Sequence, residues 1–285
     1  MTFEDISLSS YHLEQLIELA VIEDIGAGDI TTSALYGDDR KGEAVISAKE
    51  PMVIAGLEAA RRVFLKIDPE LEFFPNCSDG AKIEAGHVIA RVTGYFCSLL
   101  TGERIALNFL QRLSGIATHA RSYVDELSGK PVRLVDTRKT VPGWRALEKY
   151  AVRMGGANNH RMGLYDGILI KDNHIEAFGN IRTAIEKTRL RGSHLLKIEI
   201  EVSRLEQVRE ALAAGADVIM LDNMNDEDIQ QAVAEIDGRA MVEVSGQVAQ
   251  GRLRQLADMR VDIISVGALI HAARFVDLSM TISLL

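Results

Sequence analysis

Charged residues follow short apolar runs at regular places in the second half of the chain. Basic residues come first: Arg138 and Lys139 follow one apolar run, and Lys171 ends the next. Acidic residues come later, because Glu201 and Asp222 close the third and fourth runs. Arginine and lysine bind carboxylates and phosphates, whereas paired carboxylates hold a divalent cation or stabilise a positively charged transition state. This set predicts chemistry on an anionic substrate.

The elements that must position these residues alternate from residue 131 onward. Repeated strand-then-helix units are typical of a parallel sheet. The succession favours a small or incomplete α/β-barrel, with a doubly wound open sheet as the alternative. No Gly-x-Gly-x-x-Gly follows the first predicted strand, which argues against dinucleotide binding. Strands are predicted at 132–136, 167–171, 195–201, 217–222, 240–244 and 262–266, and helices at 142–154, 180–190, 204–214, 226–236 and 248–259.

The carboxyl ends of parallel strands meet at one edge, where such folds bind their ligands. Any single polar residue at a strand end is more often an ordinary loop residue, so the argument rests on the set. Glu199 and Glu201 are two residues apart in an otherwise apolar strand and therefore point the same way. A barrel core does not tolerate unpartnered carboxylates. The pair predicts an inward ligand site lined by acids that face basic residues.

The local charge of the sequence agrees with this picture. Residues 136–174 carry seven Lys or Arg and four acids, whereas residues 195–228 carry three bases and nine acids. We expect a positive wall that suits carboxylates or phosphates to face a negative wall that suits a cation.

Glycines after the last two predicted strands indicate a phosphate site. Ser245, Gly246 and Gln247 follow one strand, and Gly267 follows the other. Backbone N–H groups at a helix start bind phosphate when no side chain intervenes, and in barrels the last two loops commonly do so. A further candidate is the turn that presents His160 and Arg161 after Gly155 and Gly156. Trp144 is expected to be a packing residue.

The first half of the chain has a mixed pattern. Helices are predicted at 11–24, 56–67 and 100–127, with a short strand at 44–48. Residues 80–94 are expected to form a β-hairpin that turns at Gly86.

Composition limits the partners and the compartment. The formal net charge of −9 argues against general binding to nucleic acid or to a membrane surface. Cys77 and Cys97 lack the spacing of a zinc site, and a single disulfide would do little to stabilise a chain of 285 residues. With an acidic start and no long apolar run, the sequence predicts neither a signal peptide nor a membrane span, and it favours the cytoplasm.

The motifs together resemble those of quinolinate phosphoribosyltransferases, also called nicotinate-nucleotide pyrophosphorylases (carboxylating). Ile105, Val141 and Ala157 depart from residues that the family often has, but none of these departures removes a charged group. The matching segments run in order along almost the whole chain and are Glu23-Asp24-Ile25-Gly26, Gly28-Asp29-Ile30-Thr31-Thr32, Glu103-Arg104 through Asn108, Ser114-Gly115-Ile116-Ala117-Thr118, Asp136-Thr137-Arg138-Lys139-Thr140, Pro142-Gly143, Asn159-His160-Arg161, Lys171-Asp172-Asn173-His174, Leu221-Asp222-Asn223 and Ser245-Gly246.

The resemblance implies a reaction and a fold. Quinolinate and phosphoribosyl pyrophosphate would give nicotinate mononucleotide, pyrophosphate and carbon dioxide with Mg²⁺, as a step of NAD biosynthesis. An N-terminal α/β sandwich domain (1–115) would precede an incomplete α/β-barrel (116–274), and residues 275–285 would pack back on the N-terminal domain. Family members are dimers or larger homo-oligomers with shared active sites, and Arg104 would be the residue lent to the neighbour.

The resemblance also assigns roles to residues. Lys139, Lys171, Glu201 and Asp222 would be catalytic, and Glu201 and Asp222 would hold the metal as well as the ribose and pyrophosphate. Quinolinate would be bound by Arg104, Arg138, Lys139, His160, Arg161 and Lys171, and Thr137 would also bind substrate. The 5′-phosphate would be bound by Ser245, Gly246, Gln247, Val266, Gly267 and Ala268.

Three alternatives stay open from the sequence. Molybdenum-transport-associated relatives share the region around Arg138 and a His-Arg pair, but they differ around Lys171. A Schiff-base aldolase would use Lys171 as a desolvated nucleophile. A ligand-sensing protein would keep the pocket without turnover.

Overall fold

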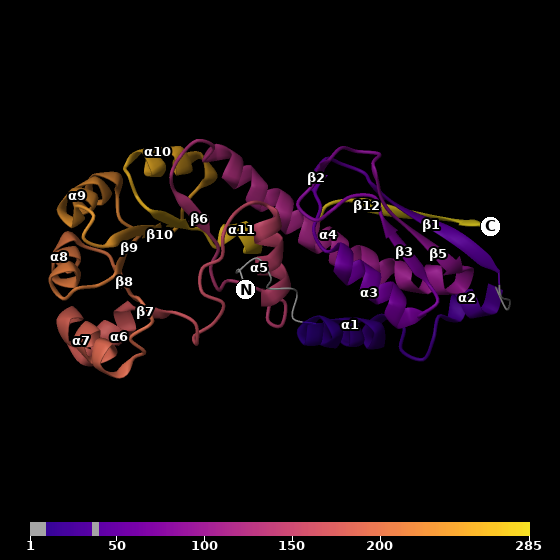
Figure 1. Ribbon diagram of the computed structural model, residues 1–285, viewed down its shortest axis with the longest axis horizontal. Coiled ribbons are helices and arrows are strands. Elements are labelled where there is room, and N and C mark those ends of the chain that lie inside the picture. Colours follow the sequence, from indigo (N-terminus) through magenta and orange to yellow (C-terminus); the bar gives the residue numbers. More distant parts are fainter. Residues whose placement is uncertain (1–9, 36–39) are drawn as a thin grey trace. The chain divides into compact units, whose positions relative to one another are not determined.

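The computed structural model describes residues 10–35 and 40–285. Within them the chain divides into two compact units (Figure 1). The first unit takes the chain up to Arg121, together with Thr140–Gly156 and Leu269–Leu285. The second unit comprises Ser122–Lys139 and Ala157–Ala268.

The second unit, as far as the structure describes it, contains a six-stranded parallel sheet in the order β6-β11-β10-β9-β8-β7. Consecutive strands from β7 to β11 are neighbours, and the first strand joins the last. This winding is that of a barrel left open between β6 and β7, so the incomplete α/β-barrel is confirmed. The strands are β6 (Arg133–Val135), β7 (Ile168–Ile170), β8 (Ile198–Val202), β9 (Val218–Asp222), β10 (Met241–Ser245) and β11 (Ile263–Ser265).

Helices of this unit lie along the outside of its strands in Figure 1. They follow their strands because a parallel sheet needs a crossover after each strand. A short helix directly after Lys171, which the sequence pattern does not predict, is capped where the Lys171 N–H donates to His174 Nδ1 at 2.9 Å. The helical elements are α6 (Asp172–Phe178), α7 (Ile181–Arg191), α8 (Leu205–Ala213), α9 (Asp226–Ile236), the 3₁₀ turn η2 (Gln250–Arg252) and α10 (Leu253–Asp258).

The two faces of the sheet differ in chemistry. In β8, Ile198, Ile200 and Val202 lie on one face and are buried, whereas Glu199 and Glu201 lie on the other. The register continues this division, because Glu201 and Glu243 are both aligned with Met220 of the strand between them. The apolar face holds the helices by burial of Ile, Val and Leu. The other face carries the carboxylates.

The opening between β6 and β7 is partly filled by the loop that carries His160 and Arg161. Asn158 forms a parallel bridge with Val135 of β6, and its N–H donates to the Leu134 carbonyl at 2.9 Å. At the other side Arg161 Nη1 donates to the Gly167 carbonyl at 2.9 Å, just before β7. The loop is therefore attached to both edges of the open barrel.

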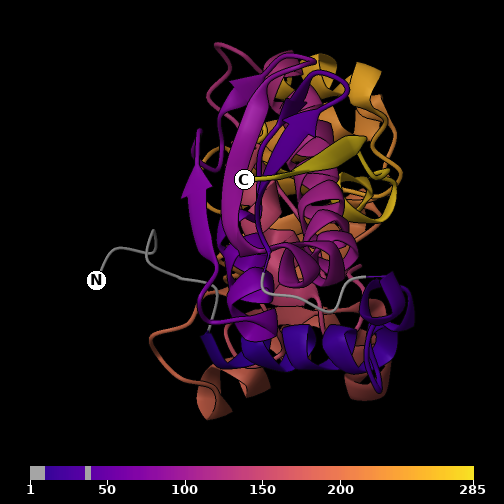
Figure 2. The same ribbon diagram turned by 90° about the vertical axis from the view of Figure 1, so that its right-hand side faces the viewer.

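The first unit is built on a sheet that, in the described residues, has four antiparallel strands in the order β12-β1-β5-β3. Figure 2 shows the C-terminal strand β12 (Leu278–Leu284) running beside β1 (Lys41–Ala48), with which it pairs. The long helix α4 (Phe96–Glu126) runs without a break through residue 115, where the sequence predicts a domain boundary. Further elements are α1 (Ser10–Asp24), α2 (Ile30–Leu35), β2 (Met52–Val53), α3 (Leu57–Ile67), β3 (Glu72–Pro75), β4 (Lys82–Ile83), β5 (Val88–Tyr95), α5 (Arg145–Met154) and α11 (Ala268–His271), of which Ala268 belongs to the second unit.

The predicted hairpin over 80–94 is wrong. Gly86 does sit in a turn, with φ of +85°. The two strands that flank it nevertheless pair elsewhere, because β4 pairs with β2, whereas β5 pairs with β1 and β3.

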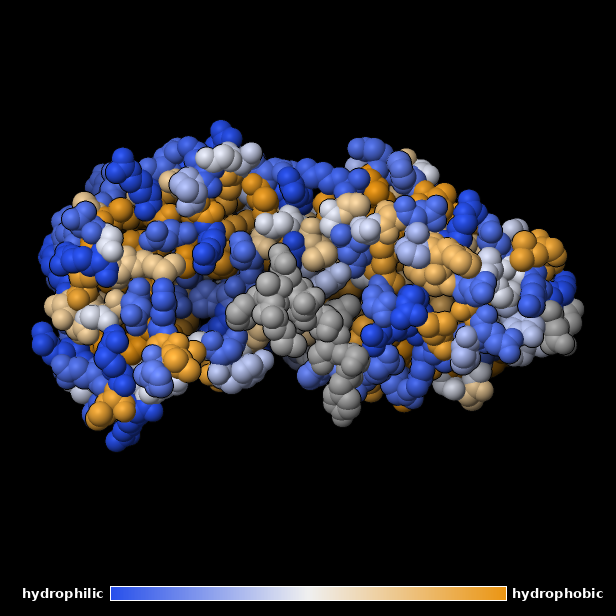
Figure 3. Space-filling model, in the orientation of Figure 1, coloured by the Kyte–Doolittle hydropathy of each residue, from blue (hydrophilic) through white to orange (hydrophobic). Residues whose placement is uncertain are grey.

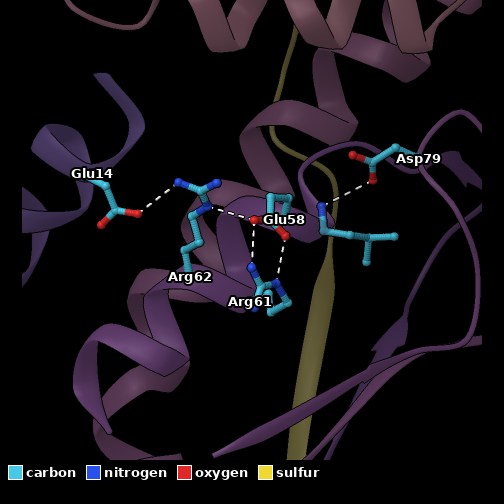
Figure 4. Close-up of polar contacts among 6 residues, drawn as sticks. Glu14, Glu58, Arg61, Arg62 and Asp79 are labelled. Atoms are coloured by element: carbon cyan, nitrogen blue, oxygen red, sulfur yellow. Dashed lines mark hydrogen bonds and ion pairs between the residues drawn. The ribbon is translucent and has the colours of Figure 1, made fainter. Parts of the chain in front are cut away.

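Charged side chains hold helix α3 at its start and along its first turns (Figure 4). Asp79 accepts hydrogen bonds from the N–H groups of Gly56 (2.9 Å) and Leu57 (3.2 Å), which satisfies free donors at the helix start. Arg62 joins Glu58 to Glu14 of α1 at 2.7 and 2.9 Å. The hydrogen bond from Arg61, with that from Arg62, lowers the pKa of Glu58 to about 2.

A buried ion pair holds α5 and the start of its preceding loop. Glu148 is fully buried, and Arg112 of α4 donates to its Oε1 at 2.6 Å. The Val141 N–H donates to the other oxygen at 2.9 Å. Trp144 stacks on Phe109 with ring centroids 4.9 Å apart, which makes it a packing residue.

Gly115 offers a test of packing in the first unit. A Cβ at this position would lie 2.0 Å from the backbone oxygen of Arg274. Alanine in a helix interior normally stabilises by about 1 kcal/mol relative to glycine, whereas overpacking a filled site costs about 1–3 kcal/mol or more. We expect Gly115→Ala to lower the free energy of unfolding in denaturant titrations. Gly251→Ala, whose Cβ would meet nothing within 4 Å, is the control. Equal stability of the two variants would contradict this prediction.

None of the helices in the described residues is both long enough and apolar enough to cross a bilayer. The face shown in Figure 3 mixes hydrophilic and hydrophobic side chains.

Candidate active site

A lysine and a glutamate meet where β7 and β8 end. Lys171 Nζ lies 2.8 Å from Glu201 Oε2. The lysine side chain is 46% exposed and the glutamate side chain 19% exposed. The pair thus combines a cation and an anion at the carboxyl edge of the barrel, and it is open to solvent on the lysine side. A lysine that is exposed and paired with a carboxylate is not a desolvated nucleophile, which disfavours the Schiff-base aldolase.

Arg138 lies close enough to Arg161 for its charge to act on the Arg161 guanidinium. Arg161 is half-buried, and its guanidinium is fixed by the Gly167 carbonyl. Burial lowers the pKa of Arg161, the charge of Arg138 lowers it further, and the carboxylates of Glu199 and Asp166 act in the opposite direction. Neighbouring like charges repel until an anion binds between them. The pair is therefore suited to bind a carboxylate group.

His160 lies over two buried carboxylates inside the barrel. Its Nε2 is 3.2 Å from Glu199 Oε2 and 3.6 Å from Glu243 Oε2. Burial lowers the pKa of His160, but hydrogen bonds to Glu199 and Glu243 and their charges outweigh it and raise the pKa to about 10. Burial raises the pKa of Glu199, the charge of Glu243 adds to this rise, and His160 opposes it.

The backbone of the same loop is fixed from the end of β6. Asp136 is fully buried and accepts from the His160 N–H at 2.9 Å and from Asn159 Nδ2 at 2.7 Å. Beyond it in the chain, Thr137 Oγ1 accepts from the Lys139 N–H at 3.1 Å, and the Lys139 side chain is exposed. Asp136 therefore joins the stretch that carries Arg138 and Lys139 to the stretch that carries His160 and Arg161.

The ends of β9 and β10 are in contact. Ser245 is aligned with Asp222, and the Asn223 N–H donates to the Ser245 carbonyl at 3.1 Å. Gly246 has φ of +90° and a Cβ there would lie 2.4 Å from Asn223 Oδ1, so only glycine fits. Gln247 also has positive φ, at +43°. Successive backbone N–H groups in such conformations form concavities that bind anions.

Two details of the predicted site are corrected. Ser245 and Gly246 do not begin a helix, since η2 starts only at Gln250, whereas Gly267 does directly precede α11. The predicted positive wall is also smaller than expected. Helix α5, which carries Arg145, Glu148, Lys149 and Arg153, belongs to the first unit, and Glu148 and Lys149 are buried. Glu148 and Lys149 therefore serve packing. The amphipathic pattern of α5 does not reveal which of its charges are solvated.

The second unit contains every predicted site residue except Arg104. Arg104 is exposed on α4, in the first unit. The others are Thr137, Arg138, Lys139, His160, Arg161, Lys171, Glu201, Asp222, Ser245, Gly246, Gln247, Val266, Gly267 and Ala268.

A surface hollow of about 660 Å³ lies beside the site. It is lined by Asn223 to Glu227 and by Arg252, which forms an ion pair with Asp226. Among its lining residues Asn223 borders Asp222, but none is itself a predicted site residue. The hollow therefore adjoins the end of β9 without coinciding with the charged groups.

Three residues of the site escaped the sequence argument. Glu243 lies inside the apolar run of β10, which is the same signal that singles out Glu199, so the same reasoning could have found it. Asp136 and Asn159 stand in the family motifs without an assigned role. Their hydrogen bonds connect segments more than twenty residues apart, which a local pattern does not reveal.

Comparisons with known proteins agree with this architecture. A family model of the quinolinate phosphoribosyl transferase C-terminal domain matches residues 116–281, and the N-terminal domain model matches residues 29–114. The chain is 47% identical over 263 residues to a probable nicotinate-nucleotide pyrophosphorylase (carboxylating) of Synechocystis sp., covering 91% of this chain and 89% of the relative.

Similar proteins extend over nearly the whole chain. A probable nicotinate-nucleotide pyrophosphorylase (carboxylating) of Bacillus subtilis is 42% identical, covering 97% of this chain and 96% of the relative. Among solved structures, NadC from Streptococcus pyogenes matches with a TM-score of 0.95 at 39% identity, covering 99% of this chain and 100% of the other. The chain therefore belongs to the quinolinate phosphoribosyltransferase family.

Proposed function

We propose that this chain transfers the phosphoribosyl group of phosphoribosyl pyrophosphate to quinolinate and decarboxylates it, which gives nicotinate mononucleotide, pyrophosphate and carbon dioxide for NAD biosynthesis. The observation that carries the proposal is the match of both family domains to a chain whose charged candidates, Arg104 excepted, lie in one compact unit. The similar proteins at 42% and 47% identity are named as probable nicotinate-nucleotide pyrophosphorylases, which favours this activity over the molybdenum-transport relative and the sensor.

Quinolinate is assigned to the basic part of the site. It is a dicarboxylate, and guanidinium groups bind carboxylates through two parallel hydrogen bonds. Arg138 and Arg161, whose charges repel each other, bind its carboxylates. Thr137 and the exposed Lys139 lie on the same stretch as Arg138, Lys171 closes the site at the rim, and His160 supplies positive charge beneath.

The ribose end is assigned to the acidic part of the site. The 5′-phosphate is held by the loop Ser245-Gly246-Gln247 and by the segment Val266-Gly267-Ala268. Glu201 and Asp222 would hold Mg²⁺, and their carboxylate oxygens are the ligands that this ion prefers. Such an ion would neutralise charge on the departing pyrophosphate. Glu201 is already paired with Lys171. When the ion binds, Glu201 would therefore either leave Lys171 or contact both the ion and Lys171.

These groups divide the reaction between them. The pyridine nitrogen attacks C1′ as pyrophosphate leaves, and the positive charge that develops on the ribose is stabilised by the carboxylates of Glu201 and Asp222. The carboxylate at ring position 2 then leaves as carbon dioxide, and its electron pair stays on the ring carbon until a proton arrives. The ammonium groups of Lys139 and Lys171 stabilise that electron pair.

The direct test is a mass-spectrometric assay. Quinolinate, phosphoribosyl pyrophosphate and Mg²⁺ should give nicotinate mononucleotide and carbon dioxide only when all three are present. Failure of both products to appear would reject the function and revive the sensor. Borohydride trapping of a carbonyl substrate on Lys171 would instead favour the aldolase.

The thiols of Cys77 and Cys97 are both free, which is consistent with action in a reducing compartment such as the cytoplasm.

A homodimer with shared sites is part of the proposal. If Arg104 completes the site of a second copy, Arg104→Ala and Arg161→Ala are each inactive as pure proteins. Mixing them after reversible dissociation gives heterodimers in which one of the two sites is intact, so roughly a quarter of wild-type activity returns. Activity and mass are measured together. A mixture that forms heterodimers but stays inactive would show that Arg104 does not act across copies.

A further inference from the structure

Two carboxylates lie under His160, and both are buried. The side chains of Glu199 and Glu243 are 11% and 1% exposed. Oxygen Oε1 of each has no hydrogen-bond partner among the described residues. Burying a carboxylate oxygen without a hydrogen bond costs free energy, so the presence of two such groups calls for an explanation. Neither residue is among those that would bind substrate or Mg²⁺.

Both carboxylates act on the same atom of the same ring. Glu199 on β8 and Glu243 on β10 approach Nε2 of His160 from two strands, with β9 between them. With both carboxylates ionised, this arrangement requires a hydrogen on Nε2, because an unprotonated nitrogen and the two carboxylate oxygens would repel one another.

The other ring nitrogen faces the chain itself. The Arg161 N–H lies 2.8 Å from His160 Nδ1 and points at it, so Nδ1 accepts in this geometry. The carboxylates favour the doubly protonated ring, whereas the Arg161 N–H favours the neutral ring. Both arrangements require the proton on Nε2. They also fix the orientation of the ring and, through the hydrogen bond to Nδ1, the position of the Arg161 backbone.

We propose that Glu199 and Glu243 are positioning residues that hold the Nε2 proton of His160 and thereby place the Arg161 guanidinium for quinolinate. The proposal rests on the proposed function, since it concerns how that substrate is bound. Asp136 fixes the backbone of the loop from β6, and the two glutamates fix its ring from β8 and β10. Among the described residues, the charged groups with recorded contacts to His160 are Asp136, Glu199, Glu243 and, through its backbone, Arg161.

The first test reads the ring without substrate. In ¹⁵N-histidine-labelled wild-type enzyme, long-range ¹⁵N–¹H spectra should show His160 with a hydrogen on Nε2 from pH 6 to pH 9, assigned by its loss in His160→Gln. A spectrum with the proton on Nδ1 alone would overturn the proposal. An unprotonated Nε2 that responds to added Mn²⁺ would also overturn it, since His160, Glu199 and Glu243 have ligand atoms within 4.8 Å of one another and would then chelate metal.

The second test separates the two substrates. Glu199→Gln and Glu243→Gln keep size but remove charge, and each should raise KM for quinolinate roughly 10- to 100-fold while leaving KM for phosphoribosyl pyrophosphate nearly unchanged. Because removing either charge lowers the pKa of His160 from about 10 toward its usual value, the imidazolium is lost at lower pH. KM for quinolinate should therefore rise with pH above neutrality more steeply in the variants than in the wild type.

A matched control comes from the same face of the sheet. Ser265 is buried, and its Oγ also has no hydrogen-bond partner among the described residues. Ser265→Ala should leave both KM values unchanged, and thermal unfolding checks that all variants are folded. Folded glutamine variants with a wild-type KM for quinolinate would reject the positioning role. A wild-type enzyme that makes no nicotinate mononucleotide would reject the proposed function instead, and the ring spectrum would still be informative.

Discussion

Replacing Arg161 with alanine is expected to lower kcat/KM for quinolinate by roughly a hundredfold to a thousandfold. Removing one partner of a desolvated, hydrogen-bonded charge pair costs about 2–5 kcal/mol, and about 1.4 kcal/mol is a factor of ten. Arg161 is half-buried, so its contact with a substrate carboxylate would be largely shielded from water. Steady-state kinetics with each substrate varied in turn measures the effect, which should fall on quinolinate.

The charge of Arg161 is separated from its shape by a second substitution. Arg161→Lys keeps the charge but loses the planar fork, including the fixed bond to the Gly167 carbonyl, so it should recover only part of the activity. Arg191→Ala, at an exposed position ending α7, should behave as the wild type. An Arg161→Ala variant with unchanged kcat/KM for quinolinate, or one affected only in KM for phosphoribosyl pyrophosphate, would remove Arg161 from the quinolinate site.

The parallel sheet and the placement of charged residues at its strand ends were predictable because both depend on local patterns. Apolar runs of strand length alternate with amphipathic helical segments, and each strand end carries a polar residue. The predicted helix at 226–236 coincides with α9, and β9 differs from its predicted range by one residue. Glu199 and Glu201 share one face of β8 as strand alternation requires. These features need no knowledge of distant contacts.

Pairing between distant segments was not predictable in this way. The residues around Gly86 satisfy the pattern of a hairpin, but β5 lies between β1 and β3, and β1 takes β12 from the end of the chain as its second neighbour. Which strands pair depends on the burial that the whole sheet achieves, and local turn chemistry does not contain that information. The same reason explains why the links of Asp136 to Asn159 and His160 were missed.

The burial of charged residues inside helices was also not predictable from the sequence. Glu148 and Lys149 are fully buried, although a helix with several charged residues normally presents them to solvent. Burial of Glu148 is tolerated because Arg112 and the Val141 N–H satisfy its carboxylate oxygens. Both partners lie outside α5, so the helical pattern of α5 does not reveal them. A sequence argument can count charges in a segment, but the partners that make burial tolerable are set by the tertiary fold.

Neutralising the acidic side of the site is expected to reduce kcat more than substrate binding. Glu201→Gln and Asp222→Asn keep the shape of each side chain and remove the negative charge that would stabilise the developing ribose cation and hold Mg²⁺. Loss of one preorganised charge at a transition state typically costs about a hundredfold to a thousandfold in kcat. Rates are measured at saturating substrates over a titration of Mg²⁺, and Asp222→Asn should need more Mg²⁺ for its residual activity.

The two variants should differ in one further respect, because Glu201 has a second partner. Glu201→Gln removes the charge that holds Lys171 at 2.8 Å, so KM for quinolinate should change as well, whereas Asp222→Asn leaves that pair in place. Glu227→Gln, at an exposed position in the first turn of α9, is the control and should keep wild-type kcat. Wild-type kcat in both site variants at ordinary Mg²⁺ would show that neither carboxylate acts on the transition state. The stabilising charge would then have to come from elsewhere in the barrel.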